Sequence, residues 1–202
     1  MYERVMFFID GENLVLRYQD MLEQEYQPLN KIKHEKDVYV WHRDVIRANV
    51  GNIIRVNYYT SAQATEDKIL SLSEDIKKIE YHYQGPPVGG GGGRYGGGTH
   101  HENFKGHIVP HIFKKKKKSV KSRIVDISIT IDMLHYASLQ MLDAVYLISC
   151  DGDYIPLIKE VMRRGVKVHL MALSIGLNPL LPISGDEFEY IDSRLLRKID
   201  NK

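Results

Sequence analysis

Apolar and polar residues along the chain predict short buried strands that alternate with amphipathic helices. Four apolar runs are typical of strands in a parallel sheet: residues 5–10, 52–61, 144–150 and 166–173. Apolar residues at helical spacing predict helices after the first strand and over 37–50, 65–83, 122–140 and 154–165. This alternation predicts an α/β fold, with a parallel sheet flanked by helices on both faces.

Local signals support several of these helices. Thr65 with the acids after it is a typical helix start, while Pro156 in a first turn and Gly165 after a last turn bound the helix over 154–165. In the helix over 122–140, the residues able to share one face are Ile124, Ile127, Ile131, Leu134 and Ala137. Residues 187–192 predict a short edge strand, and residues 193–199 predict a final helix.

Residues 84–121 interrupt the alternation. Nine of the 16 glycines lie within 85–98, a composition that supports neither a helix nor a packed strand. Residues 102–113 could pair as a strand, with Pro110 favouring an edge position. We therefore expect one domain over residues 1–202, with a flexible, Gly- and Lys-rich insertion at 84–121 that is either functional or disordered.

Composition narrows the class of protein. The 202 residues are 43% hydrophobic and 27% charged, as in an ordinary soluble domain, and no apolar run is long enough to cross a bilayer. The first ten residues enter a strand directly and predict no signal peptide. The single cysteine, Cys150, excludes an intramolecular disulfide. A reducing cytoplasmic setting, with no membrane partner, is the expectation.

The basic charge is concentrated in one segment. Residues 105–123 hold eight of the 28 Lys and Arg residues and no acid, which leaves 20 basic against 26 acidic residues elsewhere. This distribution favours a strip that binds a polyanion. The candidate nucleic-acid-binding residues are Lys114, Lys115, Lys116, Lys117, Lys118, Lys121 and Arg123.

Acidic residues follow two of the predicted strands. Asp10 ends the first strand, and Asp151 and Asp153 follow the strand over 144–150. Because ligands of an open parallel sheet bind beyond the carboxyl ends of its strands, these acids are expected to meet at one edge, with Asp126 as a fourth. Carboxylates that lie close together at this edge repel one another unless a divalent cation neutralises them. The pattern predicts a metal site.

Several blocks of sequence resemble the NYN domain family, a branch of the PIN-like nucleases. The blocks occur in the family's order over nearly the whole chain except the insertion: FFIDGEN, KSRIVDISITIDML, LISCDGDYIPLI, RRGVKV and NPLLPISGDEFEYID. The resemblance implies a Rossmann-like, PIN-like core and a Mg²⁺- or Mn²⁺-dependent ribonuclease that acts on single-stranded or structured RNA. It leaves open RNA against DNA, the mode of cleavage and whether the chain forms a homodimer.

The resemblance also implies roles for individual residues. Asp10 corresponds to the first metal ligand, Asn13 to a carboxamide beside the site and Asp126 to the acid on the helix. Asp151 and Asp153 correspond to the pair in the family's Ser-Gly-Asp-x-Asp-Phe signature, and Ser149 to its hydroxyl. The implied ligands are thus Asp10, Asp126, Asp151 and Asp153, with Asn13 and Ser149 orienting a water or the phosphate. Cys150 stands where the family usually has a small residue such as glycine.

Alternatives remain for several of these residues. Asp151 and Asp153 also suit a turn and a helix cap, and Glu12 suits a helix N-terminus. Asp132 either supports a metal ligand from behind or lies on the surface, and Asp186 either supports a ligand or caps the last elements. The cluster His100, His101, His107 and His111 fits a solvated loop better than a zinc site, because no cysteine is near. An RNA-binding module with little turnover is the second function; a dinucleotide-binding domain is disfavoured because no G-x-G-x-x-G follows the first strand.

Overall fold

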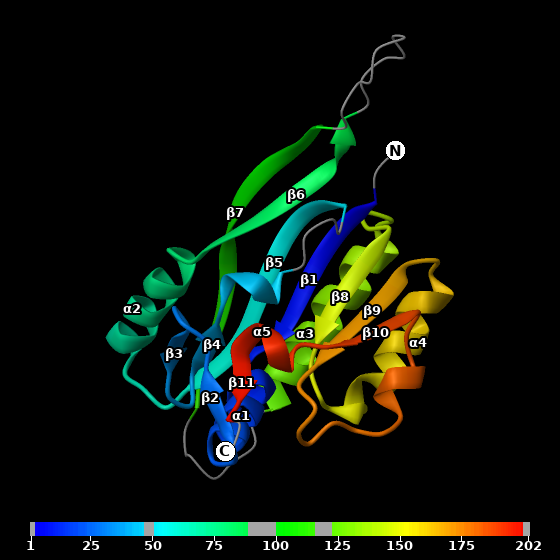
Figure 1. Ribbon diagram of the computed structural model, residues 1–202. Coiled ribbons are helices and arrows are strands. Elements are labelled where there is room, and N and C mark those ends of the chain that lie inside the picture. The colour runs from blue at the N-terminus through cyan, green and yellow to red at the C-terminus, as the bar shows by residue number, and fades with distance from the viewer. Residues whose placement is uncertain (1–2, 47–50, 89–99, 116–122, 200–202) are drawn as a thin grey trace.

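The main sheet has seven strands and is largely parallel. In a computed structural model, the structure describes residues 3–46, 51–88, 100–115 and 123–199. The strand order is β10-β9-β8-β1-β5-β7-β6 (Figure 1), and all neighbours are parallel except β6 and β7. The strands are β1 (Arg4–Asp10), β5 (Asn52–Ala62), β6 (Glu80–Val88), β7 (His100–Lys114), β8 (Ala144–Ile148), β9 (Lys167–Ala172) and β10 (Glu187–Tyr190). The predicted α/β class with a PIN-like sheet is confirmed.

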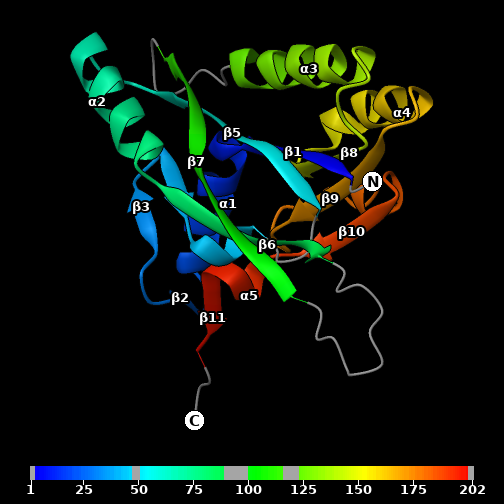
Figure 2. The ribbon, with the colours of Figure 1, turned by 90° about the horizontal axis from the view of Figure 1, so that it is seen from above.

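Helices cover both faces of this sheet. Figure 2 shows α3 and α4 over one face, and α1 and α5 over the other, while α2 packs on β7. The helices are α1 (Gly11–Leu22), α2 (Glu66–Lys77), α3 (Arg123–Ser138), α4 (Ile155–Arg163) and α5 (Asp192–Leu195), with 3₁₀ turns η1 (Arg43–Val45), η2 (Gly152–Tyr154) and η3 (Leu181–Ile183). Within the described ranges, none of these helices has the length and apolar character needed to span a membrane.

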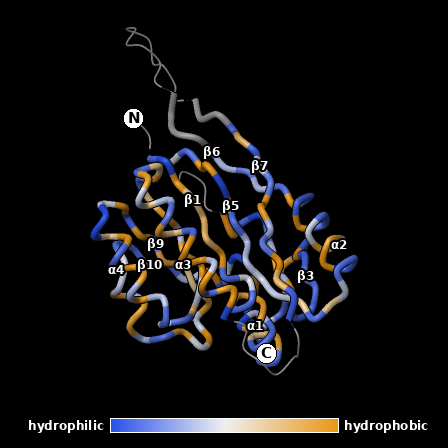
Figure 3. Tube along the Cα trace, turned by 180° about the vertical axis from the view of Figure 1, so that it is seen from behind, coloured by the Kyte–Doolittle hydropathy of each residue, from blue (hydrophilic) through white to orange (hydrophobic). Residues whose placement is uncertain are grey.

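The core consists of two layers, one on each side of β1. Val5, Phe7 and Ile9 face the layer beneath α1, and Met6 and Phe8 face the layer beneath α3 and α4. All five side chains are almost fully buried, which explains why the run is continuously apolar rather than alternating. The hydrophobic stretch of β1 lies in the middle of the molecule in Figure 3. β1 therefore provides a rigid support for Asp10, its last residue, and for the residues that follow it.

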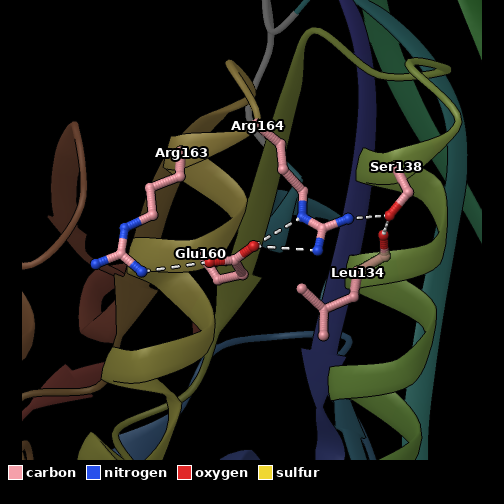
Figure 4. A network of polar contacts seen from close by, with 5 residues as sticks. All are labelled: Leu134, Ser138, Glu160, Arg163 and Arg164. Carbon is pink, nitrogen blue, oxygen red and sulfur yellow. Dashed lines mark hydrogen bonds and ion pairs between the residues drawn. The ribbon is translucent and has the colours of Figure 1, made fainter.

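Polar contacts connect α3 to α4 at the ends of both helices (Figure 4). Glu160 accepts hydrogen bonds from Arg163 at 3.4 Å and from Arg164 at 3.2 and 3.1 Å. Arg164 also donates to the Ser138 hydroxyl, which in turn donates to the Leu134 carbonyl at 2.5 Å. These contacts join the last turn of α3 to the end of α4.

Three of the predicted helices are wrong in whole or in part. Residues 37–50 form β4 (Tyr39–Trp41) and η1 instead of a helix, because the run of branched and aromatic residues pairs with β3 (Lys33–Glu35); residues 47–50 lie outside the described part. α2 stops at Lys77 and β6 follows, since buried residues there recur every second position. The final helix is only one turn, followed by β11 (Leu196–Lys198), which pairs with β2 (Tyr26–Pro28).

The predicted helix over 122–140 is present as α3, but it is rotated from the face that spacing suggested. Its buried residues are Val125, Ile129, Met133 and Ala137. Ile124, Ile127 and Ile131 are 43%, 54% and 60% exposed. Both faces of this helix are apolar, so hydrophobic spacing alone could not decide which one packs on the sheet.

Part of the segment 84–121 is regular structure rather than a flexible insertion. β7 pairs with β6 through residues 100–107 and with β5 through residues 108–114, so it belongs to the main sheet. Pro110 lies in the half that pairs with β5 alone, which agrees with the predicted edge position. The glycines over 89–99, with Arg94 and Tyr95, and residues 116–122 lie outside the described residues.

Candidate active site

Asp10 occupies the junction of the central strand and the first helix. It ends β1, and its Oδ1 accepts a hydrogen bond from the backbone nitrogen of Asn13 at 3.0 Å, which caps α1. A side chain at Gly11 would place its Cβ 2.1 Å from the Tyr58 ring, so glycine is needed at this position. The junction therefore holds the Asp10 carboxyl, which is 2% exposed, at the carboxyl edge of the sheet.

The end of β8 is hydrogen-bonded to the end of β1. The Ser149 hydroxyl donates to Asp10 Oδ2 at 3.1 Å and accepts from the backbone nitrogen of Asp151 at 3.1 Å. Asn13 Oδ1 accepts from the backbone nitrogen of Cys150 at 2.9 Å. Ser149 and Asn13 thus connect residues that are nearly 140 positions apart, and they place Asp151 beside Asp10.

The Tyr154 hydroxyl joins Asp10 to Asp126. It lies 3.2 Å from Asp10 Oδ2 and 3.2 Å from Asp126 Oδ1. A phenol has a single proton, so the Tyr154 hydroxyl donates to only one of these carboxyls. The other carboxyl must be protonated and donate to the hydroxyl oxygen. Burial raises the pKa of Asp10 to about 7, and the charge of Asp126 adds to that effect. Burial and both carboxylates also raise the pKa of Tyr154, which therefore stays a neutral phenol.

A cavity of about 300 Å³, called here the carboxylate cavity, opens beside these groups. It brings together Asp10 from β1, Asp126 from α3 and Asp151 from the end of β8, as predicted. Its lining residues are Asp10, Glu12, Asn13, Leu16, Arg17, Asp126 and Asp151. The Arg17 guanidinium, which pairs with Asp20 at 2.9 Å, adds a cation to this acidic wall.

Asp153 does not line the carboxylate cavity. Its side chain is exposed in η2, and its backbone nitrogen donates to Asp151 Oδ1 at 3.0 Å. The glycine between the two aspartates has a packing reason, because a Cβ at Gly152 would lie 2.1 Å from Asn178 Nδ2. The two aspartates therefore form a capped turn, and only Asp151 also faces the cavity.

Two of the four predicted accessory residues are not brought to the cavity. Asp132 accepts a hydrogen bond from the Tyr59 hydroxyl at 2.7 Å, between α3 and β5. Asp186 accepts from the backbone nitrogen of Val168 at 2.8 Å, at the amino end of β9 and so at the opposite edge of the sheet. The positions of Asp132 and Asp186 in the sequence suggested that both lie near the site. In the structure, the elements that carry them place both acids away from the cavity.

The structure describes three of the seven predicted nucleic-acid-binding residues. Lys114 pairs with Glu66 at 3.2 Å on the surface, and Lys115 pairs with Glu12 at 2.5 Å beside the carboxylate cavity. Arg123 is exposed at the start of α3. The remaining four, Lys116, Lys117, Lys118 and Lys121, lie outside the described residues.

The atoms of the carboxylate cavity that could bind a metal ion are oxygens, the ligand type that Mg²⁺ and Mn²⁺ prefer. Their chemistry therefore fits a hard cation. Over the described ranges, no three His, Cys, Asp or Glu side chains are arranged to hold an ion as they stand, and the Tyr154 hydroxyl lies between Asp10 and Asp126. The Cys150 thiol takes no part, because burial raises its pKa to about 11 and it donates to the Leu173 carbonyl.

The histidines do not form a zinc site in the described structure. The His107 ring hydrogen-bonds the Lys77 carbonyl, whereas the His111 ring stacks on Tyr59 with centroids 4.3 Å apart and hydrogen-bonds Asn57. Both belong to β7, so the expected solvated loop is a strand at these positions.

Sequence reasoning missed three residues of this site: Glu12, Arg17 and Tyr154. Glu12 and Arg17 lie in α1 at positions two and seven after Asp10, where helical geometry allows both to face the edge of the sheet. Tyr154 follows Asp153 directly, where the Ser-Gly-Asp-x-Asp-Phe signature ends in phenylalanine. That extra hydroxyl was visible in the sequence, but its two partners were not.

Comparisons with known proteins agree with this architecture. The family model of the NYN domain matches residues 4–191. A crystal structure of a protein of unknown function from Vibrio parahaemolyticus is similar, with a TM-score of 0.62 and 14% sequence identity over 97% of each chain. At that identity the likeness extends to the fold alone. No curated protein matches the chain.

Proposed function

Because the chain belongs to the NYN domain family, whose members are PIN-like nuclease-type domains, we propose that it is a metal-dependent ribonuclease that cleaves RNA phosphodiester bonds. The observation that carries the proposal is the convergence of Asp10, Asp126 and Asp151. Three carboxylates from three elements line one cavity at the edge where ligands of parallel sheets bind. A fold alone would not support a reaction, whereas these side chains do.

Asp10, Asp126 and Asp151 would hold Mg²⁺ or Mn²⁺, with Asp153 contributing from the rim of the cavity. When bound, the ion lowers the pKa of a bound water and neutralises charge on the attacked phosphate. Arg17 would face the same phosphate from α1 and offset its negative charge. Ser149 and Asn13 hold the ends of β1 and β8 together, so they position the carboxylates. Asn13 also lines the cavity, where its amide would orient a water or the phosphate.

The basic segment would bind the RNA backbone. Lys115 is the best placed of these residues, since it borders the carboxylate region through Glu12. Lys114 and Arg123 are exposed, so they would contribute salt-dependent contacts to phosphates. The same role is proposed for Lys116, Lys117, Lys118 and Lys121.

The test is cleavage of single-stranded and of structured RNA in the presence of Mg²⁺, Mn²⁺ or EDTA. We expect cleavage with either cation and none with EDTA. Asp151→Asn should abolish metal-dependent cleavage while leaving the fold intact or slightly more stable, because it relieves repulsion between carboxylates. Undiminished cleavage by a pure, folded Asp151→Asn preparation would place the chemistry elsewhere.

An RNA-binding module with little turnover is the second candidate. The observation in its favour is the Tyr154 hydroxyl, which lies between Asp10 and Asp126 and hydrogen-bonds both without an ion when one of the two carboxyls is protonated. Under this alternative, the chain binds RNA through the same acids, and Mg²⁺ or Mn²⁺ induces little or no cleavage. Efficient cleavage that depends on a divalent ion would exclude it.

A further inference from the structure

A second cavity adjoins the carboxylate cavity along α1. It has a volume of about 640 Å³, more than twice the 300 Å³ of the carboxylate cavity. Glu12 and Leu16 line both, so the two spaces lie side by side on this face of α1. We call it the flanking cavity; its walls are α1, the turn between β3 and β4, the connection from β5 to α2, and Lys115.

The walls of the flanking cavity combine an apolar floor with polar groups that are held in place. Val15, Ala62 and Leu72 are buried beneath it, and Leu16 is 47% exposed at its border. On one side, the Gln19 amide donates to Asp37 Oδ1 at 3.1 Å, and its oxygen accepts from the Asp37 backbone nitrogen at 2.9 Å. Charged residues complete the walls: Glu12, Glu35 and Asp37 are acidic, and Lys36, Lys68 and Lys115 are basic. An apolar floor under polar walls, in a volume between roughly 300 and 1,000 Å³, suits a small ligand with apolar faces and polar edges.

A cation is fixed at the junction of the two cavities. Lys115 Nζ bonds Glu12 Oε1 at 2.5 Å, and the Ser61 hydroxyl holds Glu12 Oε2 at 3.0 Å. The Lys115 side chain is 19% exposed, and its backbone nitrogen donates to the Ala62 carbonyl at 2.9 Å. Its ammonium therefore lies in the wall of the flanking cavity, beside the glutamate that lines both cavities.

A strand of nucleic acid matches this arrangement. Phosphates recur along it at regular intervals, so a phosphate in the carboxylate cavity requires a neighbouring nucleotide just outside. The neighbouring base is largely apolar on its faces and polar at its edges, as the flanking cavity is on its floor and walls. Cations beside the path contact the backbone without selecting a sequence. A base in a duplex is stacked on its neighbours, so only an unpaired base can enter.

We propose that the flanking cavity is the subsite for the nucleotide next to the scissile phosphate of single-stranded RNA. The proposal rests on the proposed function for the role of the carboxylate cavity. The unpaired base lies on the floor formed by Val15 and Leu72, and Lys115 faces the backbone at the passage between the cavities. The flanking cavity, rather than the carboxylate cavity, then sets the preference for single strands.

The test measures binding without cleavage. Ala64→Trp, which puts an indole into the flanking cavity, is made in an Asp151→Asn background, and fluorescence anisotropy with Mg²⁺ follows a labelled single-stranded 12-nucleotide RNA. We expect affinity to fall about tenfold, the equivalent of 1.4 kcal/mol. Gln63→Trp, at an exposed lining position, is the second variant if the first does not fold. Leu70→Trp is the matched control, because Leu70 is 64% exposed on α2 and lines neither cavity.

Two further arms make the result specific. Lys115→Gln should lower the slope of log affinity against log salt by about 0.7, the value for one phosphate of a single strand. Duplex RNA should bind the Ala64→Trp and parent proteins equally. Unchanged single-strand affinity in both folded cavity variants, or an equal loss for duplex RNA, would overturn the subsite. If the cavity variants lose affinity but the unsubstituted chain cleaves no RNA, the subsite stands and the proposed nuclease activity fails.

Discussion

Asp10 is the residue whose chemistry folding changes most. Burial raises its pKa from 3.8 to about 7, and hydrogen bonds from Asn13, Ser149 and Tyr154 offset only part of that rise. An acid with a higher pKa in the folded state keeps its proton over a range in which the unfolded chain has lost it. Between about pH 4 and pH 7 the folded state binds more protons, so the free energy of unfolding falls as pH rises.

We therefore expect the metal-free protein to lose stability as the pH rises from about 4 to about 7. The loss attributable to Asp10 is on the order of a few kcal/mol, since each pKa unit corresponds to about 1.4 kcal/mol. Urea unfolding in EDTA across this range measures the slope, with Asp10→Asn as the control that lacks the titrating group. Equal slopes for the two proteins would show that Asp10 is not buried as an acid.

The Tyr154 hydroxyl is a second single group with a large effect, because it determines which hydrogen bonds the Asp10 and Asp126 carboxyls make. Tyr154→Phe keeps the buried ring and removes both contacts with Asp10 and Asp126. We expect a loss of about 1–3 kcal/mol in the unfolding free energy of the metal-free protein, because polar groups lose a buried partner. Cleavage should persist, since the family signature has phenylalanine here. A fall of about a hundredfold or more in kcat would instead place the phenol among the reacting groups.

At the scale of elements, α3 combines two apolar faces. Ile129 is fully buried against the sheet, whereas Ile127, two residues earlier, is 54% exposed. Both residues are isoleucines, so any difference between their alanine substitutions reports the difference in burial and not in side-chain type. Substitution of a buried isoleucine removes transfer free energy and leaves a cavity, while substitution at the surface does neither.

Ile129→Ala should lower the free energy of unfolding by about 2–5 kcal/mol, and Ile127→Ala should change it by no more than about 0.5 kcal/mol. Urea denaturation at a single pH measures both. If Ile127→Ala were the more damaging substitution, α3 would be rotated to the face that its isoleucine spacing suggests, and Asp126 would no longer face Asp10.

At the scale of the whole molecule, strand order determines where the site forms. β1 lies between β5 and β8, so Asp10 and Asp151 end two adjacent strands. α3 packs on β1 and β5 and carries Asp126 to the same cavity. The edge strands β6 and β10 are remote from this arrangement in the strand order.

Hydrogen exchange of backbone amides should follow this order. β1 pairs on both sides and is buried on both faces, so its amides should exchange most slowly, whereas those of β6 and β10 should exchange fastest among the strands. Mass spectrometry of peptides from the folded chain can rank them. Comparable protection of β10 and β1 would contradict the placement of β10 at the edge.

The sequence by itself determined the alternation of strands and helices, because burial on both faces makes a parallel strand continuously apolar. It also determined that Asp10 and Asp151 end such strands, and these predictions agree with the structure. It did not determine where α2 ends, at Lys77, or that tyrosines at every second position then form β6. Nor did it determine the role of β7, whose glycine and proline are atypical of a strand. Local propensity is weak there, and pairing with β5 decides the outcome.

Only the tertiary structure decided which acids meet. Asp132 and Asp186 have the same chemistry as Asp126 and were near it in the sequence argument, but the direction of α3 and the start of β9 take them to other partners. Tertiary packing also placed the Tyr154 hydroxyl between two carboxyls and Lys115 beside Glu12. Such contacts join residues far apart in the chain, and their geometry depends on how whole elements pack, which no local pattern encodes.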